Sequence, residues 1–359
     1  MKTVTVFLVS FVLTFLLTPL VRWFCLRYSL LDIPSARKVH TRAVPRLGGI
    51  AVAVSFIFTI LLTCSISVEY QHVFYPKIPG LLAAVTVLCF IGIWDDVRGM
   101  RPIGKLIGQV ATALILFFAD FRVAFFTHPV SGAETPLPYF LSMLLTLFWV
   151  IGMINAVNLI DGLDGLATGI VCISSFCMLF VGFYLKSPVT MLFFSVVCGS
   201  SLGFLYYNFP PAKIFLGDTG SMFLGLLMAV AGLVGFQFKL ATAVTLIVPI
   251  CVMAIPIYDA ALAILRRIRK KGSVFVADKK HLHHRFLEFG FSQRQIVAGF
   301  YLATMYFGII AFLFVLIRNH YALILLVLLA MGLFMGIRAI GFIERKIKLI
   351  HRLESQQRK

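Results

Sequence analysis

Long apolar runs constrain this chain more than any other feature of its sequence. The 359 residues are 60% hydrophobic, with a mean hydropathy of +0.99, which is too apolar for a soluble domain. A run of about 20 apolar residues is long enough to cross a bilayer as a helix. We therefore predict an all-α, polytopic membrane protein with about eleven transmembrane helices. The predicted spans are residues 3–24, 47–66, 80–94, 103–119, 139–157, 166–185, 190–209, 221–236, 240–265, 296–317 and 321–343.

Basic residues are distributed unevenly between the two sides that these runs define. If the runs alternate across the membrane, one side holds 25 of the 32 Lys and Arg residues and the other holds six. The positive-inside rule makes the rich side cytoplasmic, so we predict the N-terminus outside and the C-terminus inside. The net charge of +18 then lies mainly on the cytoplasmic face. There it can meet anionic lipid headgroups and anionic soluble substrates, and we expect no nucleic-acid partner.

The sequence predicts a single membrane domain with a retained N-terminal anchor. No small-residue cleavage site follows the first run, so we expect a retained anchor rather than a removed signal. All seven cysteines lie in apolar runs without CxxC spacing, which favours packing roles over disulfides or zinc. No repeat, low-complexity tract or soluble domain stands out, so we predict one domain over residues 1–359. Its site is expected to form from cytoplasmic loops near residues 25–46, 95–102, 158–165, 210–220 and 266–295.

A polar cluster interrupts the apolar sequence between residues 155 and 169. Asp161 and Asp164 are three residues apart, so on one helical turn they share a face, and the glycine after each lets a backbone or ligand approach closely. Hard oxygen ligands in this arrangement suit Mg²⁺ and a phosphate-bearing substrate. The alternative is a glycine-rich turn whose aspartates cap the next helix.

Further acidic residues mark the ends of other apolar runs. Asp95 and Asp96 are adjacent and point to different faces of a helix. We expect Lys105, one turn into the next span, to form an ion pair or contact a phosphate; the alternative is a snorkelling lysine beside two solvated aspartates. Asp218 opens a helix after two prolines and is either its N-cap or a metal ligand. Asp259, inside the ninth run, should find a cationic partner or a water-filled cleft.

The first basic loop is a candidate phosphate site. Lys38, His40 and Arg46 precede the Gly48-Gly49 pair at a helix start. Free N–H groups at such a place can hold a phosphate, although a basic topological anchor is the default interpretation.

The longest cytoplasmic loop, residues 266–295, carries a second basic cluster. The spacing of Leu282 and Phe286 predicts a short interfacial helix with histidines on its wet side. Those histidines could contact phosphate, form a solvated face or, with a further ligand, bind zinc. Ser292 and Gln295 form a capping-box pattern for the next span.

Taken together, four motifs resemble the polyprenyl-phosphate N-acetylhexosamine-1-phosphate transferase family. They are Asp-Asp at 95–96, Asn-Leu-Ile-Asp-Gly-Leu-Asp-Gly-Leu at 158–166, Phe-Leu-Gly-Asp-Thr-Gly-Ser at 215–221 and His-Leu-His-His-Arg at 281–285. The match runs in order from about Lys38 to Glu288. It is closest to the bacterial branch that uses UDP-GlcNAc, because the peptidoglycan branch would carry three successive histidines. One departure is Ser273-Val274, where the family often has Ser-Pro.

The resemblance implies transfer of N-acetylglucosamine-1-phosphate from UDP-GlcNAc to undecaprenyl phosphate, with release of UMP. The reaction would take place at the cytoplasmic face of a bacterial inner membrane and start a lipid-linked cell-surface polysaccharide, as in lipopolysaccharide or teichoic acid synthesis. Mg²⁺ is the implied cofactor, with Mn²⁺ as a substitute. Other UDP-N-acetylhexosamines (UDP-GalNAc, UDP-MurNAc-pentapeptide), a lipid-linked-sugar transporter and a homodimer stay open.

The resemblance also assigns roles by position. Asp218 is the implied metal ligand with Asp161 near the diphosphate and Asp164 beside it, while Asp95 and Asp96 would lie near the lipid phosphate. Whether Asp95 acts as a base, orients the phosphate or takes part in a covalent route is left open. The implied catalytic residues are Asp95, Asp96, Asp161, Asp164 and Lys105; the metal ligands are Asp218 and Asp161; the substrate-binding residues are Lys38, His40, Arg46, Asn158, Arg266, Arg267, Arg269, His281, His283, His284 and Arg285.

Overall fold

The computed structural model of the chain describes residues 2–34, 42–67, 76–127, 134–235, 243–269 and 281–316, with residues 327, 331, 332 and 338. Lys38, His40, the Ser273-Val274 departure and most of the last predicted span lie outside the described residues, as does the side chain of Arg269.

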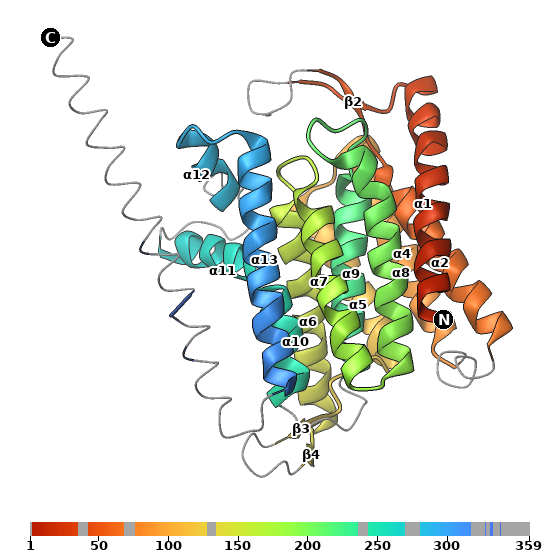
Figure 1. The fold of residues 1–359 in the computed structure, drawn as a ribbon, viewed down its shortest axis with the longest axis vertical. Helices are drawn as coiled ribbons and strands as arrows, with labels where there is room; N and C mark the ends of the chain where they lie inside the picture. The colour runs from red at the N-terminus through yellow and green to blue at the C-terminus, as the bar shows by residue number, and fades with distance from the viewer. Residues whose placement is uncertain are drawn as a thin grey trace, which may run out of the picture.

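Nine helices of the described residues form a bundle along one common direction (Figure 1). Seven are long and apolar enough to cross a membrane, and α5 and most of α9 are shorter apolar helices. The predicted all-α, polytopic class is therefore confirmed, but the predicted number of about eleven spans is not reached within the described residues. The nine are α1 (Lys2–Arg27), α2 (Gly48–Ile66), α4 (Ile78–Arg98), α5 (Pro102–Phe118), α6 (Tyr139–Ile160), α7 (Leu166–Tyr184), α8 (Pro188–Asn208), α9 (Gly217–Gly235) and α13 (Gln293–Leu316).

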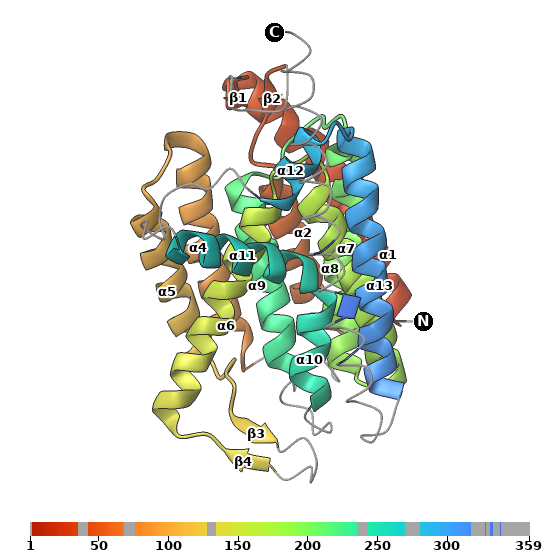
Figure 2. The same ribbon diagram turned by 90° about the vertical axis from the view of Figure 1, so that its left-hand side faces the viewer.

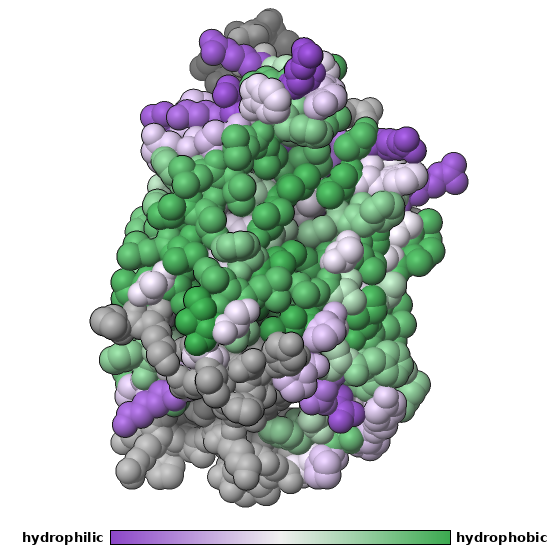
Figure 3. Space-filling model, turned by 90° about the vertical axis from the view of Figure 1, so that its right-hand side faces the viewer, coloured by the Kyte–Doolittle hydropathy of each residue, from purple (hydrophilic) through white to green (hydrophobic). Residues whose placement is uncertain are grey.

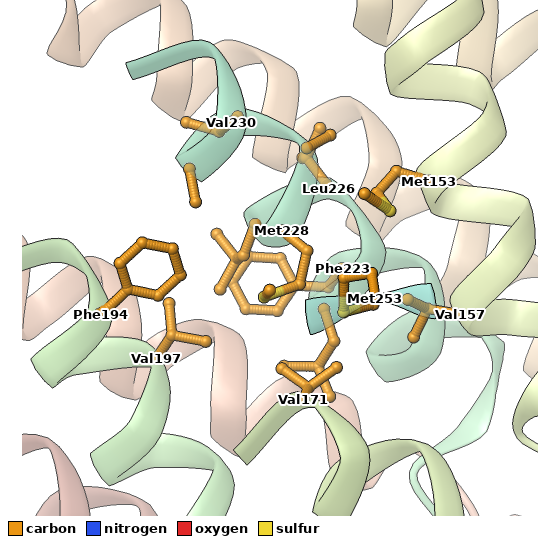
Figure 4. Close-up of a cluster of buried hydrophobic side chains, with 14 of the residues drawn as sticks. Met153, Val157, Val171, Phe194, Val197, Phe223, Leu226, Met228, Val230 and Met253 are labelled. Carbon is orange, nitrogen blue, oxygen red and sulfur yellow. The ribbon is translucent and has the colours of Figure 1, made fainter. Parts of the chain in front are cut away.

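Helix α9 is the centre of the bundle. It packs against α2, α4, α6 and α8, and its side chains from Met222 to Leu233 are buried. A helix that is apolar all round needs such surroundings on every side. A buried apolar cluster therefore holds α9 in place. Figure 4 shows α9 side chains (Phe223, Leu226, Met228 and Val230) among those of α6, α7 and α8 (Met153, Val157, Val171, Phe194 and Val197) and Met253.

The outer surface of the bundle is apolar as well. A broad apolar band crosses the face shown in Figure 3, and hydrophilic residues gather toward the two ends of that face. Large exposed apolar side chains such as Leu16, Phe58 and Phe148 lie on the outer helices. Apolar exposure on this scale is expected where lipid rather than water is the solvent.

The ninth predicted span, residues 240–265, is wrong as a single helix. The chain forms α10 (Ala243–Val252), turns at Met253, and continues as α11 (Ala254–Arg269), which crosses the bundle (Figures 1 and 2). Pro256 has no N–H to donate to the carbonyl of Val252 four residues earlier. The Ser174 hydroxyl of α7 donates to that carbonyl instead, over 2.7 Å.

Two short antiparallel ribbons lie at opposite ends of the bundle (Figure 1). Strands β3 (Phe125–Thr127) and β4 (Glu134–Pro136) pair at one end. Strands β1 (Leu31–Asp32) and β2 (Val44–Pro45) pair at the other, near the short helix α12 (Leu282–Glu288).

The Gly48-Gly49 pair is not a phosphate cradle. The N–H groups of Gly48 and Gly49 donate to the backbone carbonyls of Phe215 and Leu216 over 3.0 and 2.9 Å. The chain before α9 therefore caps the N-terminus of α2, and neither glycine N–H of this part of the described structure is left to bind an anion.

The seven cysteines are free, and all are at least partly buried. Their predicted role as packing residues is therefore confirmed.

Candidate active site

A cavity of about 360 Å³ opens at the end of the bundle that carries β1, β2 and α12. The loops after α6 and α8 and the start of α9 form its walls. Its lining is strongly acidic, and the carboxylates are Asp32, Asp96, Asp161, Asp164 and Asp218. Other polar side chains in the lining are Arg46, Asn158, Asn208, His284 and Gln293.

Asp218 stands at the start of α9 and receives side-chain donors from two other helices. Lys105 Nζ of α5 donates to one carboxylate oxygen over 3.1 Å, and Asn158 Nδ2 of α6 donates to the other over 2.5 Å. The Asp218 carboxylate does not bond the N–H near Ser221 that an N-cap would bond; the Ser221 hydroxyl instead accepts from Asn158 over 2.8 Å. Among the described residues, Asp218 is therefore held for interaction across the cavity rather than for capping.

Asp96 of α4 supplies the missing cap for α9. The backbone N–H groups of Asp218 and Thr219 donate to its two carboxylate oxygens over 2.9 and 3.0 Å, and the Thr219 hydroxyl donates over 2.7 Å. Gly217 adopts a φ of +75°, and a Cβ there would lie 2.6 Å from Asp96 Oδ2. The Asp96 carboxylate of α4 thus accepts hydrogen bonds from the first N–H groups of α9, which have no partner within their own helix.

Asp95 faces a different partner from its neighbour, as adjacent helical residues should. Its side chain is buried and pairs with Lys105, and it accepts from the backbone N–H of Met100 over 2.6 Å. Lys105 therefore bridges Asp95 and Asp218. The expected ion pair of Lys105 is present, and the alternative of a snorkelling lysine beside solvated aspartates is wrong.

Asp161 and Asp164 differ sharply in their partners. Asp164 accepts from the backbone N–H of Ala212 over 2.9 Å, which ties the loop after α6 to the loop after α8. No described residue donates a hydrogen bond to Asp161. Burial raises the pKa of Asp161 well above its usual value, and the nearby carboxylates of Asp218, Asp96 and Asp164 raise it further. The cavity thus contains one carboxylate, Asp161, to which no described group donates a hydrogen bond and with which none forms an ion pair.

Asn208 organises the two loops but was not predicted from the sequence. Its Oδ1 accepts from the N–H of Gly165 and the hydroxyl of Thr168 over 3.1 and 2.9 Å. Its Nδ2 donates to the carbonyl of Ile214 over 3.0 Å. The only signal in the sequence was an amide at the end of an apolar run, just before two prolines.

Helix α13 secures the same loops from outside. The Tyr301 hydroxyl donates to the carbonyl of Gly165 over 2.6 Å, and Arg294 Nε donates to the carbonyl of Pro210 over 3.2 Å. Neither contact is visible in sequence spacing, because each spans more than 80 residues.

Arg46 reaches the cavity from the first basic loop. Its guanidinium pairs with Asp32 and donates to the backbone carbonyl of Asp96 over 3.2 Å. The predicted substrate-binding arginine is therefore in the cavity wall, and part of its charge is offset by Asp32.

The histidine cluster lies inward, so the prediction of histidines on a wet helix face is wrong for two of them. Buried Asp259 bonds His281 Nδ1 over 2.7 Å and accepts from the N–H of Leu282 over 2.9 Å, so its partners come from the start of α12. His283 is only 1% exposed and packs on Gly162. Burial, chiefly, lowers the pKa of His283 to about 3, so its ring is neutral at physiological pH. The physical reason is that α12 packs onto α11 and α13, which turns the rings of His281 and His283 inward.

The last basic loop is only partly brought to the cavity. His284 is in the lining. Arg266, Arg267 and Arg285 are half-buried and are not among the described residues that line it. Arg266 and Arg285 instead lie within electrostatic reach of the Tyr258 hydroxyl.

The donor set suits a magnesium ion better than zinc. Among the described residues, no three His, Cys, Asp or Glu side chains are grouped as a metal cage. Mg²⁺ commonly uses one or two carboxylates and completes its shell with water and substrate phosphates. Asp161 and Asp218 line one cavity, and the unneutralised charge of Asp161 fits such an ion.

Fold and site together define a polytopic membrane protein with an acidic cavity at one end of its helix bundle. Residues 78–236 match the model of glycosyl transferase family 4. The probable undecaprenyl-phosphate N-acetylglucosaminyl 1-phosphate transferase of Bacillus subtilis is 34% identical over 310 residues, which cover 86% of this chain and 84% of that protein. The chain therefore belongs to this family of membrane transferases.

Two further relatives are similar to this chain over most of their length. The decaprenyl-phosphate N-acetylglucosaminephosphotransferase of Mycobacterium leprae is 34% identical over 325 residues, covering 85% of this chain and 81% of the relative. The undecaprenyl-phosphate alpha-N-acetylglucosaminyl 1-phosphate transferase of Thermotoga maritima is 32% identical over 275 residues, covering 77% and 79%.

Proposed function

We propose that this protein transfers N-acetylglucosamine-1-phosphate from UDP-GlcNAc to a polyprenyl phosphate, releasing UMP. The observation that carries the proposal is that Asp161 and Asp218 line the same cavity. No described group donates a hydrogen bond to Asp161, whereas Lys105 and Asn158 hold Asp218 in place. The names of the three relatives, all N-acetylglucosamine phosphate transferases, support N-acetylglucosamine as the sugar.

In the proposed reaction an oxygen of the lipid phosphate forms a bond to the phosphorus that carries the sugar. The bond from that phosphorus to the bridging oxygen breaks, and UMP leaves. Asp218 and Asp161 would hold Mg²⁺, or Mn²⁺ in its place, which when bound neutralises charge on the diphosphate. Lys105, held between Asp95 and Asp218, is not in the described cavity lining, but it supplies a positive charge directly beside Asp218.

A general base is helpful rather than required for this step. The second pKa of a phosphate monoester is near 6, so most of the lipid nucleophile is already a dianion at neutral pH. Asp95 is buried, paired with Lys105 and bonded to the N–H of Met100. These partners favour a role in orienting Lys105 over proton abstraction or a covalent intermediate.

The nucleotide sugar is proposed to enter from the side of α12. His284 and Gln293 line that part of the cavity, and His283 has a buried Nδ1 without a hydrogen-bond partner among the described residues. Neutral histidines and amides can donate to diphosphate or sugar oxygens without adding fixed charge. The remaining bases of the 266–295 loop would act at longer range.

The side of the membrane follows from the charge distribution of the sequence, and the lipid follows from the names of two relatives. We place the cavity on the cytoplasmic face of a bacterial inner membrane, with the N-terminus outside, and take undecaprenyl phosphate as the lipid. Val73→Cys and Gly132→Cys in a functional cysteine-free variant should react with an impermeant thiol reagent from outside, whereas Ala277→Cys should not. The reverse pattern would overturn the cytoplasmic site.

One assay tests the activity. Purified protein in nanodiscs is supplied with UDP-GlcNAc, and UMP release is measured with and without undecaprenyl phosphate and Mg²⁺. We expect release only when all three are present. Release with UDP-GalNAc or UDP-MurNAc-pentapeptide but not UDP-GlcNAc would change the sugar, faster reaction with decaprenyl phosphate would change the lipid, and no release with any of them would favour a lipid-linked-sugar transporter.

A further inference from the structure

A second polar layer lies one helical turn deeper in the bundle than the donors of Asp218. Gln109 follows Lys105 by four residues on α5, Asn155 precedes Asn158 by three on α6, and Met222 follows Asp218 by four on α9. Each of the three helices that meet at Asp218 thus contributes one residue to this layer.

The layer is joined by hydrogen bonds between its own members. Asn155 Nδ2 donates to Gln109 Oε1 over 2.7 Å, and Gln109 Nε2 donates back to Asn155 Oδ1 over 3.4 Å. Gln109 Nε2 also lies 3.8 Å from Met222 Sδ. Asn155 makes one further bond, to the carbonyl of Ile151 over 2.8 Å.

The amides of Gln109 and Asn155 lie between two apolar helices, where polar side chains are unusual. Gln109 is 2% exposed and belongs to α5, an apolar helix whose other buried residues include Ala113, Leu116 and Phe117. Burying an amide costs free energy unless its hydrogen bonds are made, and packing alone would favour apolar side chains of the same size. A reciprocal amide pair instead fixes the distance and rotation of α5 against α6.

We propose that the Gln109–Asn155 pair is a positioning element that sets how Lys105 and Asn158 meet Asp218. The proposal rests on the proposed function, because Asp218 is taken as a cation ligand there. Lys105 and Asn158 reach the two oxygens of one carboxylate from α5 and α6. A small slip or rotation between these helices therefore changes both contacts together, and a reactive geometry tolerates only about 0.5 Å of error. Neither Gln109 nor Asn155 lines the cavity, so each acts through its neighbours rather than on substrate.

The test compares four variants of the full-length protein in nanodiscs. Gln109→Met removes the amide at nearly constant volume, and Gln109→Asn shortens it as a milder change. The double variant Gln109→Asn/Asn155→Gln exchanges the two amides and keeps the pair. The matched control is Thr112→Val, which removes another buried polar group of α5 whose hydroxyl bonds only within its own helix, to Gly108.

Four quantities are measured for each variant: kcat and KM for UDP-GlcNAc, the Kd for Mn²⁺ alone by electron paramagnetic resonance, and the midpoint of thermal unfolding. We expect Gln109→Met to lower kcat and weaken Mn²⁺ binding by about tenfold, as loss of a residue that orients a metal ligand usually does. Its unfolding midpoint should fall no further than that of Thr112→Val. The exchanged pair should recover most of the loss, and Gln109→Asn should lie between.

Two results would overturn the proposal. One is Mn²⁺ affinity and kcat in Gln109→Met, or in Gln109→Asn if the first does not fold, equal to those of Thr112→Val. The other is an exchanged pair that is no better than the single variant. Absence of transferase activity in the wild type is a separate outcome, because it removes the proposed function while Mn²⁺ binding can still be compared.

Discussion

Gly162 and His283 are packed so closely that any side chain on Gly162 would collide with the imidazole Nε2. The glycine belongs to the loop between Asp161 and Asp164, and the histidine belongs to α12, more than 100 residues later in the chain. This contact packs the acidic loop against α12, whose His284 lines the cavity, so a shift of one part should displace the other.

Replacement of Gly162 by alanine should therefore displace His283. Overpacking of this kind costs about 1–3 kcal/mol, and we expect kcat/KM for UDP-GlcNAc to fall by tenfold or more, about 1.4 kcal/mol. Steady-state kinetics measures the effect. Gly152→Ala is the control, because nothing lies within 4 Å of a Cβ at that position. Equal kinetics of the two variants would show that His283 has no part in the reaction.

Asp218→Asn should fold and insert normally but lose nearly all turnover. An amide keeps the size of the side chain and can still accept from Asn158 or Lys105, whereas it is a poor ligand for Mg²⁺. Turnover as a function of Mg²⁺ concentration, together with gel filtration in detergent, checks both halves of the statement. Near-normal turnover would remove Asp218 from the metal site.

The lowered pKa of His283 predicts loss of stability in acid. Its pKa in the folded protein is about 3, and in the unfolded chain it is about 6.5. The neutral ring therefore stabilises the fold fully above the unfolded value, and this contribution is lost as the pH falls from there toward the folded value. Thermal unfolding from pH 8 to pH 4 should show a steeper decline for the wild type than for His283→Gln, and parallel curves would contradict the buried neutral ring.

Sequence spacing was enough to predict two local contacts. Lys105 was expected to pair with an aspartate because a buried lysine one turn into a span needs a counter-charge, and it pairs with Asp95. The Ser292 and Gln295 capping box is also present: the N–H of Ser292 donates to Gln295 Oε1 over 2.9 Å. Both features depend on short-range rules, so they can be read without a fold.

Features that depend on distant partners could not be read. The break at Met253 lies in an unbroken apolar run, and the carbonyl that Pro256 leaves unpaired is satisfied by Ser174 from another helix. His281 is buried because Asp259 binds it, although a histidine-rich loop ordinarily faces water. Hydropathy records only transfer to an apolar medium, and not which polar groups meet there.

Within the last basic loop, we expect His284 to contribute more to nucleotide-sugar binding than the arginines do. His284 lines the cavity, so His284→Gln should lower kcat/KM for UDP-GlcNAc by tenfold or more, about 1.4 kcal/mol. Arg267→Lys, which keeps the charge at a residue away from the described lining, should change it less. Apparent affinity for undecaprenyl phosphate should hold in both. A larger effect of Arg267→Lys would assign the diphosphate to the arginines, and a fall in lipid affinity alone would assign the loop to the lipid.

Asp161→Asn should stabilise the protein when no divalent cation is present. Burial and three neighbouring carboxylates raise the pKa of Asp161, so its ionised form opposes folding. The stability that this carboxyl contributes is complete below its unfolded pKa of about 3.9 and is lost as the pH rises through the folded pKa. In EDTA, the unfolding midpoint of the wild type should therefore fall more with rising pH than that of Asp161→Asn.

Added Mg²⁺ should raise the unfolding midpoint of the wild type, because a ligand bound only by the folded state stabilises it, and should leave that of Asp161→Asn nearly unchanged. Asp164→Asn is the matched control: it removes the same charge from the same loop, yet its amide oxygen can still accept the Ala212 N–H. A Mg²⁺ response that survives in Asp161→Asn and disappears in Asp164→Asn would move the cation from Asp161 to Asp164.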